Sequence, residues 1–430
     1  MFNFISKSAI LALCLISLAF SSFAVEIKLY RFFGTCDEKS TNIAVQSGEA
    51  CIIETIVRNF SERDNGITVK EMPAEWGTFY DKLKAWMVGG NPPDIFVIHK
   101  HRIPEFAGLG ALAEITEEEY YMAGIDLSDF TPLAIESLTY NNKKYGVPLD
   151  FHAYLWHINV DILAKAGLVD SDGKPILPSS PEEMLKHAKK VKDATGAYYL
   201  STWFNGTGAM RTFVALMAQQ GVDPYIGKQA NFTSDAARNA LKAMKALGDN
   251  GFAKIKAADD EVRPLFMKGN AAIIIDGTWR VDATKAMIGK EGIALKNYYV
   301  SHQPSLFQKG GAWADTHFWA VPSTLKKKNY ERYKAALKVM AHINHHNIDW
   351  ARTGHLPVRL SVLNGGPLAA LPYRDGYAKT SEVGYYMKPA KKYGKIQDAI
   401  ARELTEYFQN DKPLDDTLED LQEEVEDALN

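Results

Sequence analysis

Strand-like and helix-like segments alternate over the first hundred residues of this chain. Residues 27–33, 67–69 and 94–98 are short apolar runs bounded by turn residues, which is typical of buried strands. Between them, residues 52–60 and 79–86 repeat apolar side chains about once every helical turn. This order predicts a parallel sheet covered by helices on both faces, in which ligands bind at the carboxyl ends of the strands.

The N-terminal segment has the features of a secretory signal peptide. A basic residue precedes an apolar run from residue 9 to residue 20, and Ser22 and Ala24 are small residues of the kind that signal peptidase prefers. The run is too short to cross a membrane as a helix. We therefore expect residues 1–24 to be cleaved and the protein to be secreted into the periplasm. A lipid anchor on Cys14 is disfavoured, because a large leucine precedes this cysteine.

The net charge and the cysteines limit the partners and the covalent links that this chain is expected to have. The formal net charge is −3, without a polybasic cluster, so neither nucleic acid nor an anionic membrane surface is an expected partner. Cys36 and Cys51 flank a polar stretch. In an exported protein they are expected to form a disulfide, which would contribute about 3 kcal/mol by closing a loop of roughly 15 residues. Two buried free thiols are the alternative.

A second α/β unit follows a long extended segment. Residues 144–148, Lys-Tyr-Gly-Val-Pro, lead into that segment, where the chain is expected to change lobe. Residues 271–275 predict a buried strand that Asp276 and Gly277 end, and residues 313–322 predict a return crossing. Further helices are predicted at residues 185–191, 236–247, 330–343 and 414–425.

Five motifs in this order resemble the extracellular solute-binding proteins of ATP-driven carbohydrate importers, the group that includes maltose-binding protein. They are GGNPPDIFVIH (residues 89–99), YGVPLDFHAYLWHINVDILAKAGL (145–168), FMKGNAAIIIDGTW (266–279), WADTHFWAVP (313–322) and GHLPVR (354–359). The resemblance covers nearly all of the chain after residue 24.

The resemblance implies a two-lobed α/β fold, in which each lobe is a mostly parallel sheet flanked by helices. The N-terminal lobe is then residues 25–150 plus about 301–347, and the C-terminal lobe is residues 151–300 plus about 348–430. A monomer of this family binds a mono- or oligosaccharide in the cleft between its lobes and delivers it to the membrane permease subunits of an ABC transporter. It is not an enzyme, and we expect no cofactor and no metal.

A sugar site needs aromatic planes against the apolar face of the ring and planar polar groups around its hydroxyls. Trp279 matches the family's stacking tryptophan after a glycine turn, and Asp150 and His152 match polar contacts at the first crossing. The other predicted ligand-binding residues are His99, His101 and Arg102 after the third strand, Trp313, Asp315 and His317 on one face of an extended segment, and Trp76, Trp203, His355 and Arg359. Phe32 and Phe33 follow the first strand, where the Cys36–Cys51 loop is expected to cover them. The number of histidines suggests an acidic sugar such as a uronate.

Other functions are weighed against this one. Asp150 and Asp315 would be the carboxylate pair of a secreted glycosidase. The same fold would otherwise bind a polyamine, a glycerol phosphate compound or an iron complex. His342 and His346 have the i, i+4 spacing of zinc ligands but no third ligand nearby in sequence, so a solvated basic helix is favoured. Gly206 and Gly208 lack the lysine of a phosphate loop and are interpreted as turn glycines.

Overall fold

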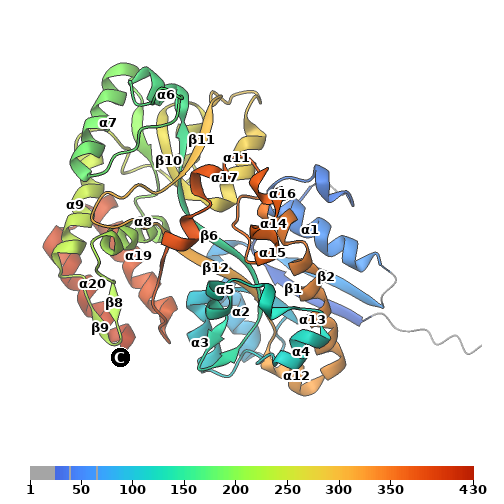
Figure 1. Ribbon diagram of the computed structural model, residues 1–430. Coiled ribbons are helices and arrows are strands. Elements are labelled where there is room, and N and C mark those ends of the chain that lie inside the picture. The colour runs from blue at the N-terminus through green and yellow to red at the C-terminus, as the bar shows by residue number, and fades with distance from the viewer. Residues whose placement is uncertain (1–24, 38–39, 64–65) are drawn as a thin grey trace, which may run out of the picture.

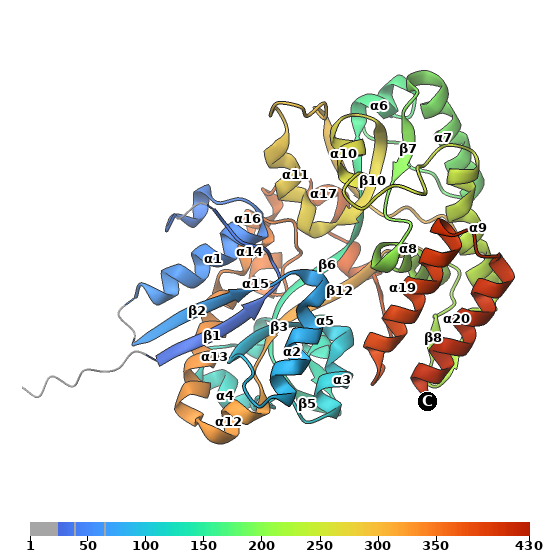
Figure 2. The same cartoon turned by 180° about the vertical axis from the view of Figure 1, so that it is seen from behind.

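The computed structural model describes residues 25–37, 40–63 and 66–430. The predicted signal peptide lies outside these ranges. Within them, two hydrophobic cores lie on either side of a central crossing of two strands, as Figures 1 and 2 show from opposite directions. No helix within the described ranges combines the length and the apolar character needed to cross a membrane.

The central sheet has the strand order β2-β1-β3-β12-β6-β10-β7, with β11 paired to β6 and β13 paired to β12. The strands are β1 (Val25–Arg31), β2 (Ile67–Pro73), β3 (Ile95–His99), β4 (Thr139–Tyr140), β5 (Lys143–Lys144), β6 (Val147–Asn159), β7 (Tyr198–Ser201), β8 (Tyr225–Ile226), β9 (Gln229–Ala230), β10 (Ala271–Gly277), β11 (Tyr298–His302), β12 (Trp313–Ala320) and β13 (Tyr385–Tyr386).

Helices cover this sheet on both sides (Figure 1). The α-helices are α1 (Gly48–Ser61), α2 (Phe79–Val88), α3 (Ile103–Gly108), α4 (Glu117–Met122), α5 (Pro132–Ser137), α6 (Val160–Lys165), α7 (Pro181–Thr195), α8 (Gly206–Gln219), α9 (Asp235–Asp249), α10 (Val262–Met267), α11 (Val281–Met287), α12 (Ser323–Lys328), α13 (Tyr330–His345), α14 (Asn347–Ala351), α15 (Leu360–Leu363), α16 (Gly366–Ala369), α17 (Arg374–Tyr377), α18 (Thr380–Val383), α19 (Tyr393–Gln409) and α20 (Leu414–Leu429). Short 3₁₀ helices include η2 (Trp76–Thr78), η3 (Lys100–Arg102) and η5 (Thr278–Arg280).

The predicted strand and helix order is confirmed in both halves. β1 pairs in parallel with β2 and β3, and β10 pairs in parallel with β7. The two crossing strands, β6 and β12, pair differently from these parallel strands. They are antiparallel to each other, β12 is antiparallel to β3, and β6 is antiparallel to β10. Asp276 and Gly277 continue β10 rather than ending it, because both keep their pairing with β6.

The crossing strand β6 sets the geometry of the molecule's centre. All 13 of its residues are buried. Its register with β12 places His152 opposite Asp315 and Asp150 opposite His317, and β12 in turn places His317 opposite His99 of β3. Five polar side chains therefore meet on three neighbouring strands, although those on β6 lie more than 160 residues in sequence from those on β12.

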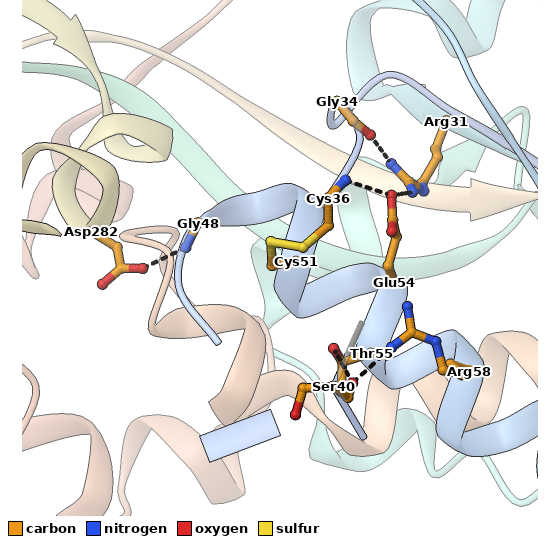
Figure 3. Close-up of a disulfide and its surroundings, with 10 residues drawn as sticks. All are labelled: Arg31, Gly34, Cys36, Ser40, Gly48, Cys51, Glu54, Thr55, Arg58 and Asp282. Carbon is orange, nitrogen blue, oxygen red and sulfur yellow. Dashed lines mark hydrogen bonds and ion pairs between the residues drawn. A yellow bond between two sulfur atoms is a disulfide. The ribbon is translucent and has the colours of Figure 1, made fainter. Parts of the chain in front are cut away.

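Cys36 and Cys51 form the predicted disulfide, and the alternative of two free thiols is wrong. The bridge joins the loop after β1 to the first turn of α1 (Figure 3). Nearby, the Gly48 backbone N–H donates a 2.6 Å hydrogen bond to Asp282 of α11. The disulfide loop is thus attached to a helix that follows β10, on the other side of the central crossing.

One expectation about α13 is wrong. Its histidines were expected to lie on a solvated basic helix, but His342 is buried and its Nε2 lies 3.0 Å from the Ile56 carbonyl oxygen of α1. The cause is the packing of α13 on α1 and β6, which turns this face of the helix inward. The division of residues between the two lobes stays a prediction.

Candidate functional site

A cavity of about 490 Å³ lies beside the central crossing. It receives residues from the ends of β1 and β3, from β6 and β12, from the first turns of α8 and from η5. The predicted residues that line it are Trp76, His99, His152, Trp203, Trp279 and His317. Elements of both hydrophobic cores therefore contribute to one cavity.

Glycines set the position of two aromatic walls. A Cβ atom at Gly277 would lie 2.2 Å from the ring of Trp279, so only glycine lets this indole fold back over the end of β10. A Cβ atom at Gly208 would lie 2.4 Å from the Cβ atom of Trp203. Both tryptophans are half-buried and line the cavity, so one face of each indole is available for stacking.

Arg211 lies among these rings. Its guanidinium carbon lies 4.2 Å from the ring centre of Trp313 and 5.5 Å from that of Trp279. The rings of Tyr154 and Trp76 lie at 5.4 and 5.9 Å. No ion pair joins Arg211 to an acid in the described part of the chain, and its buried Nε has no hydrogen-bond acceptor there. The cavity therefore contains a cation held by aromatic faces, with N–H groups left for a ligand.

Asp150 organises the polar floor of the cavity. It is fully buried and accepts hydrogen bonds from His152 Nδ1 at 3.1 Å, His317 Nδ1 at 3.0 Å and Trp350 Nε1 at 2.7 Å. Burial alone would raise the pKa of this carboxyl group, but the surrounding imidazoles, led by His317, hold it well below its ordinary value. Asp150 is therefore an ionised acceptor that fixes two histidines in place.

Burial lowers the pKa of two histidines of the floor, His152 and His99. Burial, followed by the nearby His317, lowers the pKa of His152 to about 4. The same two causes lower the pKa of His99 well below its ordinary value. His99 Nδ1 lies 2.6 Å from the Tyr80 hydroxyl, and His99 Nε2 lies 3.0 Å from His317 Nε2. At neutral pH these imidazoles offer both donors and lone pairs.

Several predicted residues support the cavity without lining it. Trp313 is buried beneath Arg211, and Asp315 accepts a hydrogen bond from His101 Nδ1. His355 Nδ1 lies 2.7 Å from the Thr353 hydroxyl, behind Asp150. These buried groups therefore lie next to the residues that line the cavity and fix the orientation of their side chains.

Arg102 and Arg359 have other partners. Arg102 pairs with Glu105 at 2.9 Å and stacks on Tyr80, while Arg359 pairs with Asp129 at 2.6 Å. Neither lines the cavity, so their prediction as ligand contacts has no support in the geometry.

The sequence reasoning missed a group of cavity residues. They are Glu49, Tyr154, Asn205, Gly206, Thr207, Gly208, Arg211, Asp259, Arg263 and Asp276. Phe32, which the sequence places after the first strand, also lines the cavity. Gly206 and Gly208 belong to the first turn of α8 and not to a plain turn as predicted. The residues at the start of α8 could have been predicted from the order of the elements. α8 begins shortly after β7 ends and therefore starts at the ligand-binding edge of a sheet.

Known proteins resemble this chain in sequence and in structure. Residues 55–374 match the family described as bacterial extracellular solute-binding protein. A maltooligosaccharide ABC transporter solute-binding lipoprotein from Streptococcus pneumoniae is 23% identical over 335 residues, covering 75% of this chain and 73% of the relative.

Two solved structures extend the likeness to nearly the whole chain. The GacH receptor of Streptomyces glaucescens, solved unliganded and with acarbose, aligns with a TM-score of 0.77 and 19% identity over 94% of this chain and 98% of its own. UgpB from Mycobacterium tuberculosis, solved with glycerophosphocholine, gives a TM-score of 0.76 and 19% identity over the same shares. These likenesses confirm the predicted two-lobed α/β fold.

Proposed function

The chain belongs to the bacterial extracellular solute-binding protein family, and from this membership we propose that it is the substrate-binding component of an ABC importer that takes up a saccharide. The observation that carries the proposal is the composition of the cavity wall. Trp76, Trp203 and Trp279 supply aromatic planes, and the histidine floor with Arg211 supplies planar donors and acceptors. A pyranose needs both, and a cavity of about 490 Å³ is of the size found for small-molecule sites.

Binding would involve hinge closure around the ligand. Trp279 follows β10 and Trp76 follows β2, so the rings come from opposite ends of the central sheet. A ligand touching both would stabilise the closed arrangement by its contacts across the cavity. On this view residues 25–150 with about 301–347 form one lobe, and residues 151–300 with about 348–430 form the other.

The proposed cellular role follows from the family and the N-terminal pattern. After cleavage following residue 24, the protein would act in the periplasm as a monomer and deliver its ligand to ABC permease subunits. The S. pneumoniae relative carries the name of such a transporter component.

The glycosidase pair predicted from the sequence, Asp150 and Asp315, is disfavoured by its position and by its pKa shifts. Neither Asp150 nor Asp315 lines the cavity, and each is already bound by histidine donors. Both have a lowered pKa, because the histidine partners outweigh burial. A general acid needs the opposite shift.

One observation favours an acidic saccharide as a second candidate ligand class. Arg211 has no acidic partner in the described chain, and a ligand carboxylate would supply one. Neutral sugars would instead use the guanidinium as a hydrogen-bond donor to hydroxyl groups.

A thermal-shift screen of the protein tests these proposals. The panel would contain neutral mono- and oligosaccharides, uronates, polyamines and glycerophosphodiesters. A ligand at a hundred times its dissociation constant should stabilise the protein by about 2.7 kcal/mol. A saccharide that stabilises the protein and is recovered unchanged supports the importer role. Stabilisation by amines or phosphodiesters alone, or consumption of the sugar, contradicts it.

A further inference from the structure

Three buried histidines share the floor of the cavity. His99, His152 and His317 are only 1 to 3% exposed, and all three line the cavity. One ring nitrogen from each lies within 4.8 Å of those of the other two.

The outer nitrogen of each ring is held by another side chain. Asp150 binds the Nδ1 atoms of both His152 and His317, and the Tyr80 hydroxyl lies against His99 Nδ1. His152 Nε2 is buried and has no hydrogen-bond partner among the described residues. Metal-binding histidines have this arrangement, in which a carboxylate or hydroxyl fixes one nitrogen and the other faces the ion.

The Nε2 atoms of His99 and His317 are close enough to bind one ion. They lie 3.0 Å apart, whereas two ligands at 2.0–2.1 Å from a tetrahedral zinc ion are about 3.3 Å apart. A shift of a few tenths of an ångström opens the pair. Without a metal, one of these two Nε2 atoms must carry a proton, and His99 carries it. If this proton moves to His99 Nδ1, the Tyr80 hydroxyl oxygen can accept it in a hydrogen bond. The lone pairs of both Nε2 atoms are then free to bind the metal.

The surrounding charges also suit a cation. The carboxylates of Asp150 and Asp315 are buried behind the histidines, whereas Arg211, whose charge opposes a metal, stacks on Trp313 near His152. A second group, Asp150, His317 and His355, is less suitable, because Asp150 and His355 lie outside the cavity and Asp150 already accepts three hydrogen bonds.

We propose that His99, His152 and His317 bind one divalent transition-metal ion such as Zn²⁺, with open coordination positions that face the cavity beside Trp279. Three imidazole ligands with an open position are typical of zinc sites that bind a further ligand. An oxygen of the solute, from a hydroxyl or a carboxylate group, would complete the coordination. This site replaces the metal-free expectation from the sequence and does not depend on the proposed sugar function.

The experiment uses protein without a polyhistidine tag, freed of metal with a chelator and then dialysed. Calorimetric titration with Zn²⁺ alone should give one ion per chain, and Co²⁺ alone should give the visible absorption of a low-symmetry nitrogen-coordinated ion. His152→Gln and His99→Gln should each weaken Zn²⁺ binding by about 100-fold or more, since each removes a ligand. Asp150→Asn should weaken it by about 10- to 100-fold by releasing two ligands.

His346→Ala is the matched control, because it removes a histidine of the i, i+4 pair at the end of α13, and His346 does not line the cavity. It should leave Zn²⁺ affinity unchanged, and circular dichroism checks that each variant is folded. No binding by the wild-type protein overturns the proposal. So does affinity that survives both glutamine substitutions, or affinity that is lost in His346→Ala, which would identify an adventitious surface site only.

Discussion

Acid should destabilise this protein well above the pH at which Asp150 and Asp315 titrate. His152 is held neutral in the folded state with a pKa of about 4, compared with 6.5 for an ordinary histidine. The unfolded chain therefore binds protons more readily between these values, and the free energy of unfolding falls as the pH falls. At about 1.4 kcal/mol for each pKa unit, the full effect is about 3 kcal/mol for His152 alone.

Most of this loss occurs before the carboxylates contribute. By pH 4.5, about 2 kcal/mol of the stability attributed to His152 should be gone. His355, whose pKa burial lowers to about 3, adds a loss over the same range. Asp150 and Asp315 have lowered pKa values, so the stability that they contribute is lost only below the ordinary aspartate value of 3.8.

The assay is urea unfolding followed by circular dichroism at pH 7, 6, 5 and 4.5. His152→Gln lacks the titrating group, so its free energy of unfolding should fall by about 2 kcal/mol less than that of the wild type over this range. His302→Gln is the control, because His302 is exposed and should lose as much as the wild type. Constant stability from pH 7 to pH 4.5, or parallel losses in the wild type and His152→Gln, would refute the view that burial keeps these histidines neutral.

Three further changes test other parts of the structure. Trp279→Ala should weaken saccharide binding by about 2 kcal/mol through lost stacking and burial, measured by calorimetric titration; unchanged affinity would remove the ring from the site. Arg211→Gln should weaken binding of an acidic saccharide by about 2 kcal/mol, because a charged hydrogen bond is lost, and neutral sugars by less; equal losses in the same titration would argue against a carboxylate partner. Replacing Cys36 and Cys51 by serine should lower the free energy of unfolding by about 3 kcal/mol in urea, since the closed loop spans 15 residues; an unchanged value would show that the loop is ordered without the bridge.

The helices and strands with strong local patterns could be predicted from the sequence, because neighbouring residues alone determine them. β10 is a run of buried branched side chains between glycines, and α9 repeats alanine and leucine at helical spacing. The disulfide followed from export and from a short polar loop. Trp279 could be placed near the cavity because it follows Gly277 in the same way as the stacking tryptophan of the family that the sequence resembles.

The partners of the polar residues could not be predicted, because strand register decides them. His317 meets His99 and Asp150 only through the pairing of β12 with β3 and β6, over separations of more than 160 residues. Arg211 is the one charged residue of the largely buried helix α8, but the aromatic rings that surround it come from distant parts of the chain. Which of the cavity residues touch a ligand stays a prediction.

The crossing strand β6 and the two final helices also determine when this chain can fold. β6 cannot complete its pairing until β12 has been made. The apolar face of α8 is covered by α19, which begins only at Tyr393. Neither hydrophobic core can close until most of the polypeptide is present, and such long-range topology folds slowly. A chain of this kind, threaded through a membrane channel from its N-terminus, would stay extended and free of stable structure during passage. The core that α8 shares with α19 would close only when these last helices emerge on the far side.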